Sequence, residues 1–104
     1  MNPLDDPILA RLRASLQKTY GDKIERVVLF GSRARGDARP DSDYDVAVFL
    51  RGSDSFWTES GRLAAIETDI LDETGAVVNA LPFDSSRSDV GALTAELARD
   101  GLEL

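Results

Sequence analysis

Two aspartates separated by one residue stand at the start of an apolar run. Asp43 and Asp45 flank Tyr44 in the segment DYDVAVFL, whose β-branched and aromatic residues predict a strand. Side chains two residues apart on a strand point to the same face, and a rise of about 3.3 Å per residue separates their Cα atoms by about 6.5 Å. Two carboxylates at that separation can share one or two divalent ions of the kind that serve phosphoryl transfer. Their mutual repulsion disfavours the metal-free state, so the pair is predicted to attract cations.

The loop before this strand contains a second candidate group, the residues GSRARG. It follows the apolar run 24–30, which is too short for a helix and predicts a buried strand. Gly31 allows the backbone to approach a ligand closely, and Ser32 adds a hydroxyl at a turn that we expect to continue as a short helix. Free N–H groups at such a start suit the terminal phosphates of a nucleotide. Arg33 and Arg35 are typical of surface or acid-pairing residues, and Arg35, inside the turn, is the better candidate for contacting phosphate.

Two better-known motifs that this segment partly matches are excluded by individual residues. The spacing from Gly31 to Gly36 is that of a P-loop, but Asp37 stands where the motif requires lysine. The alternating aspartates also match the first positions of a calcium-binding EF-hand loop. Val46 stands where that loop requires glycine, and Gly52 stands where it requires a bidentate glutamate. Neither mechanism is available to this chain.

Composition excludes several other function classes. The 104 residues contain no cysteine and no histidine, so disulfides, thiolate metal sites, histidine-ligated zinc and Ser-His-Asp catalysis are excluded. The net charge of −7 argues against direct nucleic-acid binding and favours partners with a basic surface. No apolar run is long enough to span a membrane, and the N-terminus does not read as a secretion signal. These features predict a cytoplasmic protein that handles phosphate through a divalent cation.

Periodicity predicts the elements that must hold these groups in place. Three apolar strands need helices to cover them, which predicts a single α/β (α+β) domain over residues 1–104 with a small mixed sheet of about three or more strands. We expect helices at 5–20 and 58–73 and strands at 24–30, 44–50 and 76–83. A last helix is expected to be capped by Ser86 or Ser88 and to end before Gly101; its apolar residues are Val90, Leu93 and Leu97.

Taken together, GSRARG and SDYDVAVFL resemble the minimal nucleotidyltransferases (MNT) of the DNA polymerase beta superfamily. The family hallmark is a hydrophobic residue with Gly-[Gly/Ser], followed by Asp-hydrophobic-[Asp/Glu]-hydrophobic; it corresponds here to residues 30–32 and 43–46. The resemblance implies a nucleotidyltransferase fold and transfer of a nucleotide from a Mg²⁺-bound NTP. It also implies that the glycine and serine contact the phosphates and that the two aspartates hold the metal.

The resemblance also implies a partner. Small stand-alone members are typically antitoxins of HEPN-domain ribonuclease toxins, and some transfer AMP from ATP to a tyrosine of the toxin. The implied function is therefore Mg²⁺-dependent AMP transfer to a hydroxyl of a partner HEPN toxin, with ATP as the substrate.

One feature of the family pattern is missing. Members carry a third acidic residue on the next strand, and the corresponding segment here, AVVNALPF, offers only Asn79 as a polar side chain. An amide has no negative charge and cannot act as a base. Asn79 therefore faces either the active site or a backbone partner, and Asp84, just after the strand, is a candidate substitute. The alternative function is a catalytically degenerate antitoxin that neutralises its partner by binding alone.

Overall fold

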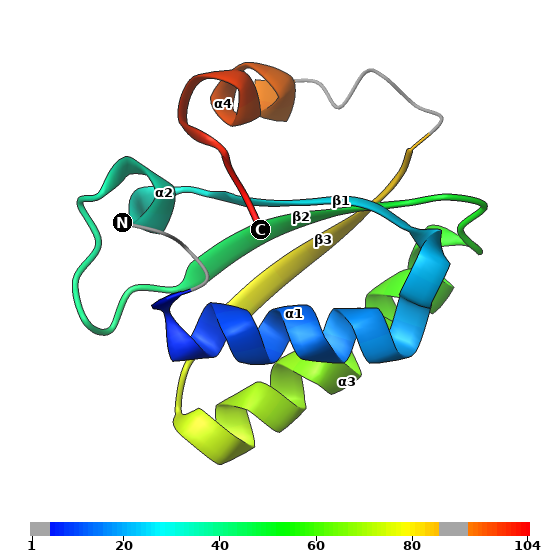
Figure 1. Ribbon diagram of the computed structural model, residues 1–104, viewed down its shortest axis with the longest axis horizontal. Helices are drawn as coiled ribbons and strands as arrows, with labels where there is room; N and C mark the ends of the chain where they lie inside the picture. Colours follow the sequence, from blue (N-terminus) through cyan, green and yellow to red (C-terminus); the bar gives the residue numbers. More distant parts are fainter. Residues whose placement is uncertain (1–4, 86–91) are drawn as a thin grey trace.

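A computed structural model of the protein describes residues 5–85 and 92–104 (Figure 1). It shows a four-stranded sheet with helices on both faces, as the predicted small mixed sheet requires. The helices are α1 (Pro7–Tyr20), η2 (Gly21–Lys23), α2 (Ser32–Arg35), α3 (Phe56–Thr74) and α4 (Ala92–Asp100), and the strands are β1 (Ile24–Phe30), β2 (Tyr44–Leu50), β3 (Val78–Asp84) and β4 (Leu102–Glu103).

The strands follow one another in space in the order β3-β2-β1-β4. β2 is antiparallel to β1 and parallel to β3, while the short β4 pairs with β1 and was not among the predicted strands. Because β2 and β3 run in parallel, both begin at the same end of the sheet, which is also the end where the antiparallel β1 finishes. The end of β1, the start of β2 and the start of β3 therefore lie side by side.

The two faces of the sheet differ in how they are covered. α1 and α3 lie together against one face, where alternate residues of β2 join the main core. α4 lies on the other face, where Leu97 packs against Val28, Ala47 and Phe49 (Figure 1). Asp45 has the same parity along β2 as Ala47 and Phe49, so its side chain belongs to the α4 face. The predicted aspartate pair is thus kept out of the main core.

The helices α1 and α3 begin at side-chain caps. Asp6 accepts a hydrogen bond from the Ile8 N–H at 2.8 Å, and Pro7 occupies the first turn of α1. Ser55 caps α3 by accepting from Thr58 N–H, so the helix starts two residues before the predicted 58. The apolar periodicity missed Phe56 and Trp57 because neither side chain faces the core, and the Trp57 side chain is 81% exposed.

The last helix agrees with the prediction where the structure describes it. The proposed caps Ser86 and Ser88, together with Val90, lie outside the described residues. Leu97 is buried, and the Gly101 N–H closes α4 by donating to the Leu97 carbonyl at 3.0 Å. In the described parts of the chain, no helix has the length and apolar character needed to cross a membrane.

β3 forms one edge of the sheet, and its outward backbone is protected. The Ala80 N–H, which points away from β2, donates to Oε2 of Glu67 on α3 at 3.1 Å. Pro82 has the same parity along the strand and has no N–H to offer. These two features leave the edge poorly suited to pair with a strand of another chain.

Glu67 provides a first prediction about stability. Burial raises the pKa of its carboxyl group, and the Ala80 N–H only partly opposes this effect. A raised pKa in the folded state means that the contribution of Glu67 to stability is largest at acid pH and falls as pH rises through the titration range. Glu67→Gln keeps an acceptor oxygen without the charge, so we expect unchanged or higher stability at pH 7, whereas Glu67→Ala should cost about 1 kcal/mol. Urea unfolding at pH 4 and pH 7 measures both variants; equal losses in the two at pH 7 would contradict this assignment.

Candidate functional site

Three polar side chains from neighbouring positions meet at the edge of the sheet where β2 and β3 begin. Asp45 lies opposite Phe30 on β1 and opposite Asn79 on β3 in the strand register. The Asn79 amide nitrogen donates to Asp43 Oδ2 at 3.1 Å and to Asp45 Oδ1 at 3.2 Å. The two aspartates therefore share one face, as predicted. Of the two alternatives for Asn79, the structure shows the one in which it faces the aspartate pair.

Gly31 brings the loop after β1 into contact with this pair. Its backbone, with φ of 76° and ψ of −157°, lies in a region that side-chain-bearing residues rarely adopt. A Cβ atom at this position would lie 2.5 Å from Asp45 Oδ2. One carboxylate oxygen of Asp45 thus faces the glycine, and the other faces Asn79. Glycine is required here both for the conformation and for the close approach.

Ser32 begins α2, the single helical turn that was expected after this glycine. The N–H groups of Ala34 and Arg35 both donate to the Gly31 carbonyl at 3.1 Å, which closes the turn. The N–H groups at the start of a helix have no acceptor within it, so those at Ser32 and Arg33 can serve a ligand. They lie next to Gly31, on the loop side of the Asp45 carboxylate. Binding of phosphate by Gly31 and Ser32 stays a prediction.

Arg33 organises the loop that joins α2 to β2. Its guanidinium lies 3.9 Å from the centre of the Tyr44 ring and donates to the Ser42 carbonyl at 2.9 and 3.0 Å. It also reaches the carbonyls of Arg39 and Pro40. The sequence predicted a surface or acid-pairing residue, but its partners are backbone carbonyls and an aromatic face. The Arg33 guanidinium thus supplies N–H donors to three carbonyl groups of the loop. This contact depends on the tertiary structure.

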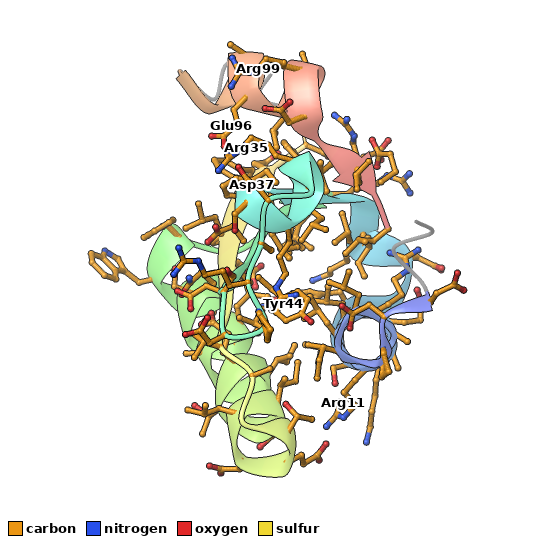
Figure 2. The ribbon with its side chains drawn as sticks, turned by 90° about the vertical axis from the view of Figure 1, so that its left-hand side faces the viewer. Arg11, Arg35, Asp37, Tyr44, Glu96 and Arg99 are labelled. Atoms are coloured by element: carbon orange, nitrogen blue, oxygen red, sulfur yellow. The ribbon has the colours of Figure 1, made fainter. Side chains whose placement is uncertain are left out.

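Arg35 projects from α2 toward α4 (Figure 2). Its side chain is exposed and makes ion pairs with Asp37 at 3.4 Å and with Glu96 at 3.5 Å. The acid-pairing role is therefore confirmed. Pairs that are this long and exposed contribute little to stability, so they leave the guanidinium able to exchange partners. Phosphate binding by Arg35 stays a prediction.

Asp84 does not substitute for the missing third acid. It lies opposite Leu50, at the far end of β3 from Asn79, which lies opposite Asp45. Asp84 lies five residue steps along the strand from Asn79, a distance of about 16 Å. The Ser53 hydroxyl lies 3.2 Å from its Oδ2. The suggestion that Asp84 bends into the site is wrong, because the strand continues straight through Pro82 and Phe83.

The donor set suits a hard divalent cation. Asp43 and Asp45 offer carboxylate oxygens, which are the ligands that Mg²⁺ prefers, and Mg²⁺ usually completes its shell with water and substrate phosphates. Within residues 5–85 and 92–104, no group of three histidine, cysteine or acidic side chains is placed to hold a metal. The pair therefore fits a magnesium ion that takes its remaining ligands from outside the described residues.

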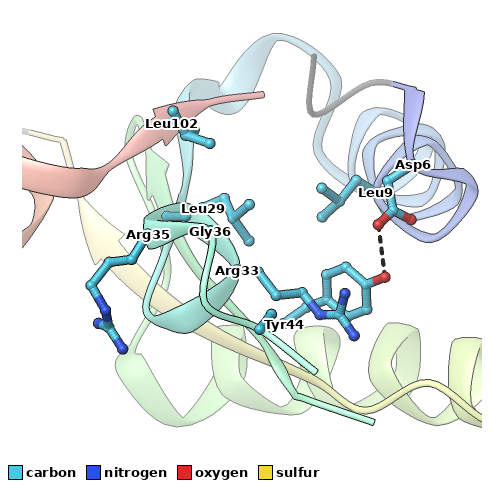
Figure 3. Close-up of a pocket in the computed structure, with 10 residues that line it drawn as sticks. Asp6, Leu9, Leu29, Arg33, Arg35, Gly36, Tyr44 and Leu102 are labelled. Carbon is cyan, nitrogen blue, oxygen red and sulfur yellow. Dashed lines mark hydrogen bonds between the residues drawn. The ribbon is translucent and has the colours of Figure 1, made fainter. Parts of the chain in front are cut away.

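A separate cavity of about 430 Å³ lies on the opposite face of the sheet (Figure 3). Tyr44, between the two aspartates in sequence, points into it, and its hydroxyl donates to Asp6 Oδ2 at 2.8 Å. Leu9, Leu29 and Leu102 form much of its apolar wall. Since strand neighbours point to opposite faces, this cavity is not the space in front of the aspartate pair.

The Tyr44 hydroxyl provides a second stability prediction. Burial raises its pKa to about 12, and the neighbouring Asp6 carboxylate acts in the same direction. Because the folded pKa exceeds the unfolded value of about 10, this group's contribution to stability is lost as pH rises above about 10. Tyr44→Phe should cost about 1–3 kcal/mol at pH 7 through the lost hydrogen bond to Asp6, and it should flatten the alkaline loss of stability. Thermal unfolding between pH 7 and 11 measures both effects; an unchanged alkaline slope would contradict the assignment.

The chain is similar to known proteins over most of its length. Residues 9–97 match the family model described as "Nucleotidyltransferase domain". A curated relative from Methanocaldococcus jannaschii, "Putative protein adenylyltransferase MJ0141", is 39% identical over 44 residues, which are 42% of this chain. That match covers only 44% of the relative, less than half of its length.

Two solved structures share the fold. A crystal structure of a toxin–antitoxin with AMP-PNP superposes with a TM-score of 0.68 at 19% identity, covering 90% of this chain and 69% of the other. The complex of a tri-AMPylated Shewanella oneidensis HEPN toxin with its MNT antitoxin gives 0.60 at 16% identity, covering 92% of this chain and 70% of the other. At these identities the similarity concerns the fold alone. The chain belongs to the nucleotidyltransferase domain family.

Proposed function

We propose that this protein transfers AMP from ATP, bound with Mg²⁺, to a hydroxyl group of a partner protein, and that the partner is a HEPN-type toxin. The observation that carries this proposal is the contact between the phosphate-loop glycine, Gly31, and the Asp45 carboxylate. It supports the proposal because the turn that begins at Ser32 and the carboxylates of Asp43 and Asp45 lie at one corner of the sheet. Phosphoryl transfer requires both positioning and charge neutralisation, and this corner offers the groups for each.

Each residue has a defined part in this proposal. Backbone N–H groups and the hydroxyl at Ser32 hold the terminal phosphates, and Arg35 leaves its acidic partners to contact them. Asp43 and Asp45 would hold a magnesium ion, which would supply charge neutralisation for the phosphates and for the pyrophosphate that leaves when AMP is transferred. Arg33 keeps the loop between these groups in place through the Ser42 carbonyl.

The relatives support the nature of the acceptor. The curated relative is named as a protein adenylyltransferase, and one structural neighbour is an antitoxin bound to an AMPylated HEPN toxin. The acidic surface of this protein, with a net charge of −7, suits a partner with a basic face. We propose that the protein is cytoplasmic, because the chain contains no cysteine and therefore none of the disulfides that are typical of proteins in oxidising compartments.

A transfer assay tests the proposal directly. The protein is incubated with its purified partner and with ATP labelled on the α-phosphate, in the presence of Mg²⁺ or of EDTA. We expect label on the partner only with Mg²⁺, and mass spectrometry should locate it on a hydroxyl side chain. ATP labelled on the γ-phosphate is the matched control and should leave no label. Binding of the partner without any transfer would remove catalysis from the proposal.

A second function is favoured by a specific observation, the neutral Asn79 next to the aspartate pair. Without a third carboxylate, the protein would neutralise its partner by contact alone. Mixing the two proteins in nucleotide-free buffer with EDTA distinguishes the proposals. Full suppression of the partner's ribonuclease activity under these conditions supports neutralisation by binding, whereas suppression that requires ATP and Mg²⁺ supports the enzyme.

A further inference from the structure

The Asn79 side chain bridges the two site aspartates. Its amide nitrogen lies within hydrogen-bonding distance of one oxygen from each carboxylate. A metal ion that bridged the pair from the β3 side would need the same two oxygens. We infer that Asn79 is a positioning residue that replaces one of the two metal ions, so that the site holds a single divalent ion together with the nucleotide. This inference rests on the proposed function.

The two sides of the aspartate pair are chemically different. On the loop side, Asp45 Oδ2 faces Gly31 and the phosphate-binding turn. On the side of the edge strand, Asp45 Oδ1 and Asp43 Oδ2 both accept from the Asn79 amide. The loop side is therefore the place for an ion that also contacts phosphate. The β3 side is already bridged by two N–H donors.

Charge and ligand counts point to the same conclusion. Two magnesium ions about 3.5–4 Å apart need bridging carboxylates and about six oxygen ligands each. In the described part of the chain, no third acidic side chain joins Asp43 and Asp45 in a group able to hold a metal. The neutral amide relieves the repulsion between the aspartates through two hydrogen bonds to charged acceptors, which are stronger than hydrogen bonds between neutral groups. The pair is thus ordered without a second ion.

Asn79→Asp tests the inference, with Asn79→Ala as the control that removes the bridge without adding charge. Metal content is measured by native mass spectrometry with Mn²⁺ and a non-hydrolysable ATP analogue. We expect one Mn²⁺ per chain in the wild type and in Asn79→Ala, and two in Asn79→Asp.

Thermal unfolding without metal or nucleotide gives an independent readout. Asn79→Asp should unfold at a lower temperature than the wild type, because three carboxylates then meet without a cation, and Mn²⁺ should restore its stability. Two Mn²⁺ ions in the wild type would overturn the inference and leave the proposed function standing. One ion in Asn79→Asp would also overturn it, because Asn79 would then not set the number of ions. If no protein takes up Mn²⁺ with the analogue, the proposed function fails along with the inference.

Discussion

Replacing Gly31 with alanine is expected to abolish nucleotide binding and to destabilise the fold. The new Cβ would lie 2.5 Å from Asp45 Oδ2, and the backbone φ of 76° is one that alanine adopts only with strain. Strain of this kind costs about 1–3 kcal/mol. In a domain of this size each kcal/mol lowers the melting temperature by roughly 4–8 °C. The displaced carboxylate should also lose its position beside the phosphate-binding turn, so affinity for Mg²⁺ and ATP should fall beyond detection.

Gly36→Ala is the matched control for this variant. Gly36 ends α2 with a φ of 83°, so alanine is strained there too, but a Cβ would meet no atom within 4 Å. We expect a loss of about 1–2 kcal/mol with nucleotide binding retained. Calorimetric titration with ATP and Mg²⁺, alongside thermal unfolding, measures both properties. Equal nucleotide affinity in the two alanine variants would show that the approach of Gly31 to Asp45 has no role in binding.

Replacing both aspartates with asparagine is expected to remove AMP transfer while leaving the protein folded. Asp43 and Asp45 are both accessible on the α4 face, and their contact with Asn79 does not belong to the main core. A bound metal contributes several kcal/mol to stabilising the transition state, and each 1.36 kcal/mol is a tenfold change in rate. We therefore expect the transfer rate to fall by about a hundredfold or more.

The combined Asp43→Asn, Asp45→Asn variant also separates the two proposed functions. Its binding to the partner and its suppression of the partner's ribonuclease activity are measured next to transfer of labelled AMP. Normal binding with lost suppression supports the enzyme, whereas full suppression supports neutralisation by contact. Asp37→Asn is the matched control, because Asp37 is an exposed acid near the site that pairs with Arg35 at 3.4 Å. It should transfer at no less than the wild-type rate, because loss of this pair leaves Arg35 freer to contact phosphate.

The sequence determined those features of the site that depend on neighbouring residues. The two-residue spacing of Asp43 and Asp45 places them on one face of any strand, and the structure shows both in contact with the same amide. The need for glycine at position 31 also follows from its place between a strand and a turn. Local periodicity identified the main strands and helices for the same reason, since burial of alternate or every third and fourth residue is a property of the segment itself.

The tertiary structure decided the features that depend on register and packing between distant segments. Asn79 reaches the aspartates because β3 pairs with β2 in a register that places it opposite Asp45, and the same register carries Asp84 to the far end. The segment 76–83 alone does not fix that register, because the register also depends on the strand and helix that β3 packs against, β2 and α3. Arg33 likewise found its partners in a folded loop of carbonyls and the Tyr44 ring, which no local pattern encodes.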